Sequence, residues 1–186
     1  QCPDGAAQFV ATRVGSRALG VLARDALAEL TRAGLLDTAA RAVVEALERA
    51  VGALTRTLAG QGERVEWERL PDAALEAATD IATALGALGT RLGAPALEVA
   101  AVRQCGRRAV DAEQRLRAIL DAAPGEGLRW IEAGPRAFSV ELMPFEVAPR
   151  LAAHFAARPA AWICTSATLA VDTDFSHFLG RIGLAQ

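Results

Sequence analysis

Apolar residues recur at three- and four-residue steps through the first two thirds of the chain, and this spacing predicts long amphipathic helices. Four such runs stand out, at residues 16–33, 37–58, 71–92 and 102–119. Segments containing glycine or proline separate the runs, and Ser16 is the expected N-cap of the first. Four long helices joined by short loops predict an antiparallel bundle.

The pattern changes near residue 124. Residues 128–132 and 138–142 alternate apolar and polar side chains on either side of a Gly-Pro turn, which predicts a β-hairpin or two neighbouring strands. Helical spacing returns at 145–157, and the apolar run 160–164 is typical of a short buried strand. Strand, helix and strand in this order predict a piece of an α/β sheet.

Two segments have weaker patterns. Residues 65–70 alternate as in a short strand or an extended linker, and residues 1–15 open irregularly. The predicted fold class is therefore mainly α, with a lead-in segment at 1–15, a helical bundle at 16–123 and a small α/β part at 124–186.

The composition is that of a globular domain, with 52% hydrophobic and 23% charged residues. A net charge of −2 means that the chain as a whole does not attract nucleic acid, so any such contact needs a local patch. No apolar run reaches the roughly 20 residues that cross a bilayer, and no basic and apolar leader is visible. We therefore expect a cytoplasmic location and no membrane partner.

Cysteine and histidine usage predicts no metal site. Cys2, Cys105 and Cys164 are odd in number and far apart, which fits neither a disulfide framework nor a metal knuckle. His154 and His177 have no partner at ligand spacing. The chain starts at a glutamine rather than a methionine, which favours a segment of a longer or processed protein.

The chemically most specific stretch runs from Trp162 to Leu169 (Trp-Ile-Cys-Thr-Ser-Ala-Thr-Leu). It places small and hydroxyl-bearing residues at the carboxyl end of the predicted strand, where open α/β sheets carry their ligand-facing loops. Hydroxyl groups can donate hydrogen bonds to carboxylate or phosphate oxygens. Taken alone, such a run is more often a turn that leads into the next helix.

The surroundings of this stretch resemble a known family. The run from Trp162 to Ala170, with Asp174-Phe-Ser-His-Phe178 and Arg181-Ile-Gly-Leu184 after it, resembles motif III of DinG/YoaA-type helicases, bacterial relatives of the XPD helicases. The YoaA branch is the closer resemblance. Residues 138–147 resemble the strand and helix that enter this motif, so the likeness covers about the last third of the chain.

The N-terminus fits the same family. Gln1-Cys-Pro-Asp4 resembles the segment that follows the family's Asp-Glu-Ala-His box, and a helical insertion, the arch domain, lies between that box and motif III. The resemblance implies that residues 16–123 are an arch-like domain and that 124–186 are the C-terminal part of the first RecA-like motor domain.

For the parent protein, the resemblance implies an ATP-dependent 5′-to-3′ DNA helicase that uses ATP, Mg²⁺ and a 4Fe-4S cluster. Its partners would be single-stranded DNA and a replication or DNA-repair protein. This chain has no lysine for a phosphate loop, no acidic box and no cysteine spacing for the cluster. We therefore expect no cofactor within it and no ATP hydrolysis by it alone.

The resemblance assigns the motif III role to Ser166, Ala167 and Thr168, which would couple the phosphate state to the grip on DNA rather than perform chemistry. Thr165 flanks this loop and is a weaker candidate, whereas Cys164 is expected to be a buried strand residue. Hydroxyl hydrogen bonds suit coupling, because each contributes only about 0.5–1.5 kcal/mol net and is easily exchanged.

A second candidate site lies on the polar face of the fourth helix, opposite its apolar stripe. Four arginines make it up: Arg103, Arg107, Arg108 and Arg115. Within an arch they would contact the phosphates of single-stranded DNA. The alternative is a solvated face whose charge is balanced by Asp111 and Glu113.

Other interpretations remain open. Trp67 and Trp130 would stack on bases or, as is more common at strand-like alternation, belong to the core. The chain as a whole is alternatively a free-standing helical-bundle adaptor that binds a protein through an exposed apolar face. A secreted protein is disfavoured by the odd cysteine count.

Overall fold

The computed structural model describes residues 11–94, 99–157, 160–163 and 174–184. The helices are α2 (Ser16–Arg32), α3 (Thr38–Thr57), α4 (Asp72–Leu92), α5 (Ala100–Leu120), α6 (Ala148–Ala156) and α7 (Ser176–Arg181), with a 3-10 turn at Trp67–Arg69. The strands are β1 (Thr12–Gly15), β2 (Arg64–Glu66), β3 (Gly127–Ala133) and β4 (Phe138–Pro144). One compact unit comprises residues 12–122 and 129–142, and the other described residues form a second unit.

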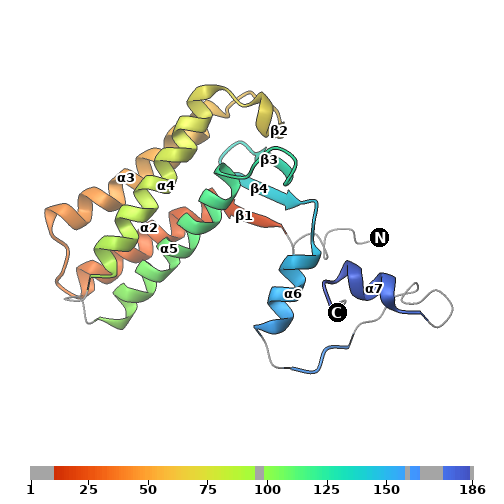
Figure 1. Cartoon of the computed structure of the whole chain (residues 1–186). Helices are drawn as coiled ribbons and strands as arrows, with labels where there is room; N and C mark the ends of the chain where they lie inside the picture. Colours follow the sequence, from red (N-terminus) through yellow and green to blue (C-terminus); the bar gives the residue numbers. More distant parts are fainter. Residues whose placement is uncertain (1–10, 95–98, 158–159, 164–173, 185–186) are drawn as a thin grey trace. The chain divides into compact units, whose positions relative to one another are not determined.

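The first unit is built on a bundle of α2, α3, α4 and α5 (Figure 1). Each helix packs against two others, in the pairs α2–α3, α3–α4, α4–α5 and α2–α5. Asp37 begins α3 by accepting a hydrogen bond from the Ala40 N–H at 2.7 Å, and Gly34 follows α2 with a φ of 67°. The predicted four-helix bundle is confirmed.

A small antiparallel sheet belongs to the same unit and has the strand order β1-β4-β3-β2. The two predicted strands within 128–142 are confirmed as β3 and β4, and of the two predicted alternatives they form the hairpin. β1 lies in the segment that was expected to be irregular, and that expectation is wrong for residues 12–15. Thr12–Gly15 pairs with β4 from Leu142 to Ser139, a partner more than a hundred residues away that local pattern does not reveal.

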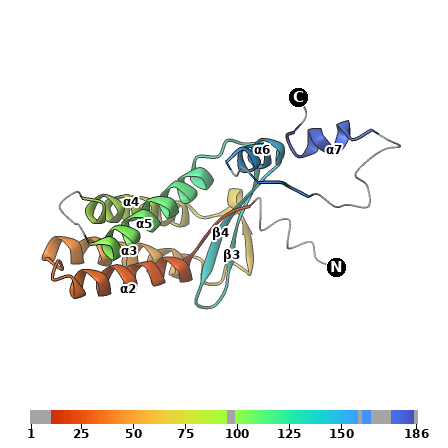
Figure 2. The same cartoon turned by 90° about the horizontal axis from the view of Figure 1, so that it is seen from below.

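The junction of β1 and α2 also corrects the expected helix start. Gly15 is the N-cap of α2, and the Ser16 hydroxyl instead accepts a hydrogen bond from the Phe138 N–H at 2.9 Å. Figure 2 shows β1 leading directly into α2. Ser16 is buried, and its hydroxyl is the hydrogen-bond acceptor for the amide at the start of β4.

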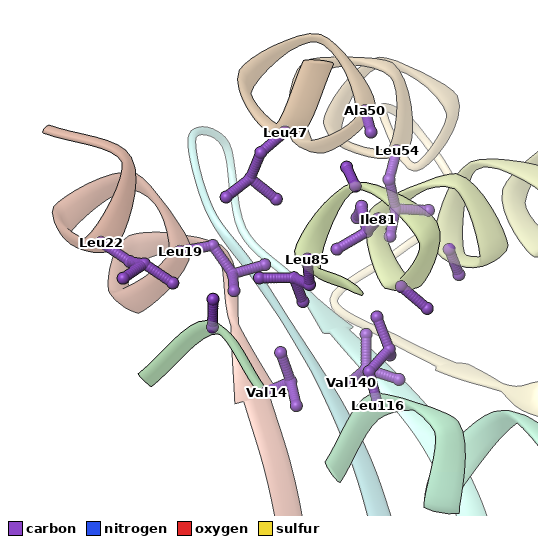
Figure 3. Close-up of a cluster of buried hydrophobic side chains, with 14 of the residues drawn as sticks. Val14, Leu19, Leu22, Leu47, Ala50, Leu54, Ile81, Leu85, Leu116 and Val140 are labelled. Carbon is purple, nitrogen blue, oxygen red and sulfur yellow. The ribbon is translucent and has the colours of Figure 1, made fainter. Parts of the chain in front are cut away.

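The core runs between the four helices and continues to the sheet, and Figure 3 shows the part where the two meet. Val14 and Val140 from the sheet meet leucines and an isoleucine of all four helices, and each of these side chains is at most 5% exposed. Alanines at the α3–α4 and α4–α5 contacts are equally buried and let the helices approach closely, as the alanine-rich composition predicts.

The second unit contains α6 and α7. Gly183 follows α7 with a φ of 75°, and a Cβ there would overlap the carbonyl oxygen of Ala148 in α6. Trp162 contacts Phe155 of α6, with ring centroids 4.9 Å apart. The absence of a side chain at Gly183 therefore lets the chain after α7 approach the start of α6.

The predicted buried strand at 160–164 is wrong for its described part. Residues 160–163 form no strand, and Ile163 is 91% exposed. A single apolar run becomes a strand only beside a strand that it can pair with, and none of the described strands is its neighbour. Cys164 lies outside the described residues. Among the helices that the structure describes, none is long and apolar enough to cross a membrane.

Candidate nucleic-acid interface

The predicted coupling loop cannot be placed, since Ser166, Ala167 and Thr168, together with Thr165, lie outside the described residues. Its role therefore stays a prediction. Beyond it, Asp174 accepts hydrogen bonds from the N–H and the hydroxyl of Ser176, both at 2.8 Å. These bonds lower the pKa of the Asp174 carboxyl and fix the start of α7.

The four predicted arginines lie on α5, but they differ in their partners. Arg108 is paired with Asp25 of α2, with Nη1 and Oδ2 2.6 Å apart. Arg115 is paired with Asp111 one turn earlier, at 3.0 Å. Half of the set is therefore already compensated by a carboxylate.

The other two arginines keep their charge available. Arg103 is exposed and makes no hydrogen bond or ion pair with any residue that the structure describes. Arg107 is exposed and donates from Nε to the neutral side-chain oxygen of Gln104 at 3.2 Å. Glu113, the other expected counter-ion, pairs with Arg117 at 2.8 Å.

Arg103 and Arg107 border a groove of about 370 Å³ between α4 and α5. Its walls include three glycines, where the helix backbones come close together. A Cβ on Gly106 would lie 3.1 Å from the Leu92 Cβ and 3.2 Å from the backbone nitrogen of Gly93. The glycines therefore let α4 and α5 pack closely beside the groove, which carries cationic side chains at one lip.

The two tryptophans of the first unit are occupied by arginines of the same chain. The Arg129 guanidinium lies over the Trp67 ring at 5.1 Å, and that of Arg64 over the Trp130 ring at 4.3 Å. Trp67 is 7% and Trp130 8% exposed. The expectation that these rings are structural is confirmed, and neither presents a free face to a base.

A polar network that the sequence did not predict lies on the face of the sheet that points away from the hydrophobic core. Arg13 of β1 pairs with Glu141 of β4 at 3.3 Å, and the Ser139 hydroxyl donates to the same carboxylate at 2.7 Å. The sequence alternation of β4 could have indicated part of this network, because the polar residues of the strand share one face. Their partner Arg13 was hidden in a segment expected to be irregular.

A hollow of about 920 Å³ lies beside this network. Its walls carry Arg13, Arg17 and Arg64, but also Glu63 and Glu132. The positive and negative charges nearly cancel. The hollow therefore attracts an anion less strongly than the arginines at the lip of the α4–α5 groove do.

Metal-ligating side chains do not converge in the described part of the chain: no three His, Cys, Asp or Glu side chains lie where they could hold an ion. Cys105 is buried in the bundle core at 3% exposure, and desolvation raises the pKa of its thiol. Cys105 is thus an inert core residue.

Comparison with known proteins shows that a part of the chain is similar in sequence to DNA helicases. It is 42% identical over 57 residues to the ATP-dependent DNA helicase YoaA of Escherichia coli, which is 31% of this chain and 9% of that protein. It is 44% identical over 55 residues to the YoaA helicase of Haemophilus influenzae, which is 30% of this chain and again 9% of the relative. No family model and no solved structure matches the chain. This chain therefore contains a YoaA-like segment, and the match spans less than a tenth of the length of either relative.

Proposed function

We propose that this chain is an internal segment of an ATP-dependent DNA helicase of the YoaA type. The observation that carries the proposal is the 42% identity of a 57-residue segment to such a helicase. The motif-III-like run in residues 162–184 and the helical bundle before it support the same assignment. In the parent, the bundle is the arch, and residues 124–186 belong to the first motor domain.

We assign different roles to the arginines of the bundle and to the hydroxyl-bearing residues of the motif-III-like run. The bundle guides single-stranded DNA through the arginine face of α5, with Arg103 and Arg107 as the principal phosphate contacts. Arg108 and Arg115 add less, because Asp25 and Asp111 already compensate them. Ser166 and Thr168 exchange hydrogen bonds between nucleotide states and so couple ATP hydrolysis to translocation.

The parent's cofactors are not held by this chain. A 4Fe-4S cluster takes four thiolates, whereas the chain has three cysteines and Cys105 is buried in the core. A phosphate loop needs a lysine that the sequence lacks. We assign ATP, Mg²⁺ and the cluster to other parts of the parent, which acts in the cytoplasm with a replication or repair protein.

The adaptor alternative gains no support from the bundle surface. Its exposed large apolar side chains among the described residues are Val21, Val99 and Val110, each between 37% and 40% exposed. They come from α2, the segment before α5, and α5, so they are scattered singly rather than gathered on one helix face.

The coding sequence on either side of this segment tests the proposal. We expect a phosphate loop and an Asp-Glu-Ala-His box upstream, the box directly before Gln1, and the remaining helicase motifs downstream of Gln186. A reading frame that holds neither upstream motif would contradict the helicase assignment.

A further inference from the structure

The groove between α4 and α5 has two arginines at one lip, and we propose that it is a track for the backbone of single-stranded DNA. In this proposal Arg103 and Arg107 each hold one phosphate, and no base is recognised. The inference rests on the proposed helicase function and specifies where on the bundle the strand lies.

The pairing of charges favours phosphate binding at Arg103 and Arg107 over the rest of α5. Every other arginine of the helix has a carboxylate partner: Asp25 for Arg108, Asp111 for Arg115 and Glu113 for Arg117. An anion that approaches those arginines must displace a carboxylate, whereas Arg103 has no carboxylate partner among the residues that the structure describes. Arg107 would exchange a neutral amide for a phosphate, which makes a stronger, charge-assisted hydrogen bond.

Spacing lets the two arginines act on one strand. They are four residues apart in α5, so they lie on the same face, about 6 Å apart along the helix axis. Both border the same groove. Each can therefore reach a different phosphate of one strand that follows the groove.

The helix backbones at the groove offer no hydrogen-bond donor to a base. Gly89, Gly93 and Gly106 border the groove where α4 and α5 pack together, and a Cβ on Gly89 would meet the Val110 Cγ2 at 2.7 Å. The amides of the helix interior are already hydrogen-bonded, so this part of the groove gives van der Waals contact and no base-specific donor. The 39% exposed Val110 adds an apolar wall that suits a sugar.

Asp111 limits the track to two phosphates. It lines the groove one turn beyond Arg107, and its side chain is 60% exposed although it pairs with Arg115. A third phosphate would meet this carboxylate. No aromatic side chain lines the groove, and Trp67 and Trp130 are covered by arginines. Contact is thus through phosphates alone and independent of base sequence.

Titration of labelled oligothymidine with the chain at several salt concentrations tests the track. A single-strand phosphate contact contributes about 0.7 to the slope of log K against log salt. We expect Arg103→Gln and Arg107→Gln each to lower the slope by about 0.7, and the double variant by about 1.4. Arg41→Gln is the matched control, because Arg41 is exposed on α3 and makes no side-chain contact with the described residues.

Asp111→Asn provides a gain of binding that loss of folding cannot mimic. It removes the carboxylate from the groove and releases Arg115, so we expect tighter binding than that of the unaltered chain. A mixed-sequence oligonucleotide should bind within a few-fold of oligothymidine, since no base is contacted. Circular dichroism of each variant confirms that the bundle is folded.

Several results would overturn the track. They are no binding by the unaltered chain, a double variant with the slope of Arg41→Gln, or a strong preference between the two oligonucleotides. Displacement of DNA by oligoglutamate, charge for charge, would identify an acidic protein segment as the occupant instead. Any of these leaves the helicase assignment standing, whereas a missing phosphate loop upstream removes that assignment whatever the slope.

Discussion

Arg129 ties three elements of the bundle unit together. Its guanidinium covers Trp67, pairs with Glu68 at 3.6 Å and donates to the carbonyl oxygens of Ile119 and Leu120 at the end of α5. Its side chain is only 12% exposed. The charge is tolerated there because an aromatic ring, a carboxylate and two carbonyl oxygens surround the planar group.

We expect Arg129→Ala to lower the free energy of unfolding by about 2 kcal/mol, because the ring contact and two hydrogen bonds to carbonyls are lost together. Arg129→Lys should restore little, since an ammonium lacks the planar face. Urea unfolding measures both. Arg69→Ala serves as the control, because the pair of Arg69 with Glu66 is largely exposed, and its loss should cost less than about 0.5 kcal/mol. Equal losses at the two positions would refute the role of Arg129.

Asp37 makes stability depend on pH. Its hydrogen bond from the Ala40 N–H, followed by the charge of Arg91, lowers the pKa of this carboxyl. A lowered folded-state pKa means that the ionised form stabilises the fold above the ordinary carboxyl pKa, and that this is lost as pH falls through the folded-state value. Asp37→Asn keeps the cap acceptor and removes the charge.

We therefore expect Asp37→Asn to unfold at lower urea than the unaltered chain at about pH 7, with the difference shrinking toward about pH 3. A difference that stays constant over this range would show that the charge of Asp37 contributes nothing.

Single residues also show what the sequence could and could not predict of the site. Periodicity placed Arg103, Arg107, Arg108 and Arg115 on one helix, and all four are there. The pairing of Arg115 with Asp111, four residues earlier, follows the local sequence, whereas Arg108 is paired with Asp25, which α2 brings from 83 positions earlier. No local pattern contains this second partner, and the motif III residues lie outside the described part.

At the scale of elements, the α4–α5 contact depends on small residues. A Cβ on Gly106 would press on the backbone of Leu92 and Gly93, which cannot rotate away. A Cβ on Gly20 of α2 would meet only the tip of Arg24, at an ordinary 3.7 Å. The two glycines are both in helix interiors, so they differ in packing rather than in backbone entropy.

We expect Gly106→Ala to destabilise the bundle by about 1–3 kcal/mol through overpacking. Gly20→Ala should instead stabilise it by about 0.5–1 kcal/mol, since alanine favours the helix. Thermal unfolding of the two variants measures the contrast. If both variants gain stability, α4 and α5 are not in backbone contact.

Elements differ in how well the sequence predicts them, and the reason is the range of the contacts that form them. The helices and the β3–β4 hairpin depend on neighbours in sequence, and both were predicted. β1 needs β4 as its partner, and the run 160–163 has the composition of a strand but no described partner. Strand formation is decided by pairing, which composition alone does not show.

At the scale of the whole molecule, the chain contains a helical bundle and a segment that is similar in sequence to YoaA helicases. The isolated chain lacks the lysine of a phosphate loop. We expect phosphate release from ATP to stay at the level of buffer, with or without single-stranded DNA. Turnover above that level would overturn the assignment of the nucleotide site to other parts of the parent.

The most direct test of the central claim is strand unwinding by the full-length parent protein. We expect ATP-dependent release of the labelled strand from a duplex with a 5′ single-stranded tail, and none from the matching duplex with a 3′ tail. Failure to unwind either duplex with ATP, Mg²⁺ and an intact cluster present would contradict the claim that this chain is a segment of a YoaA-type helicase.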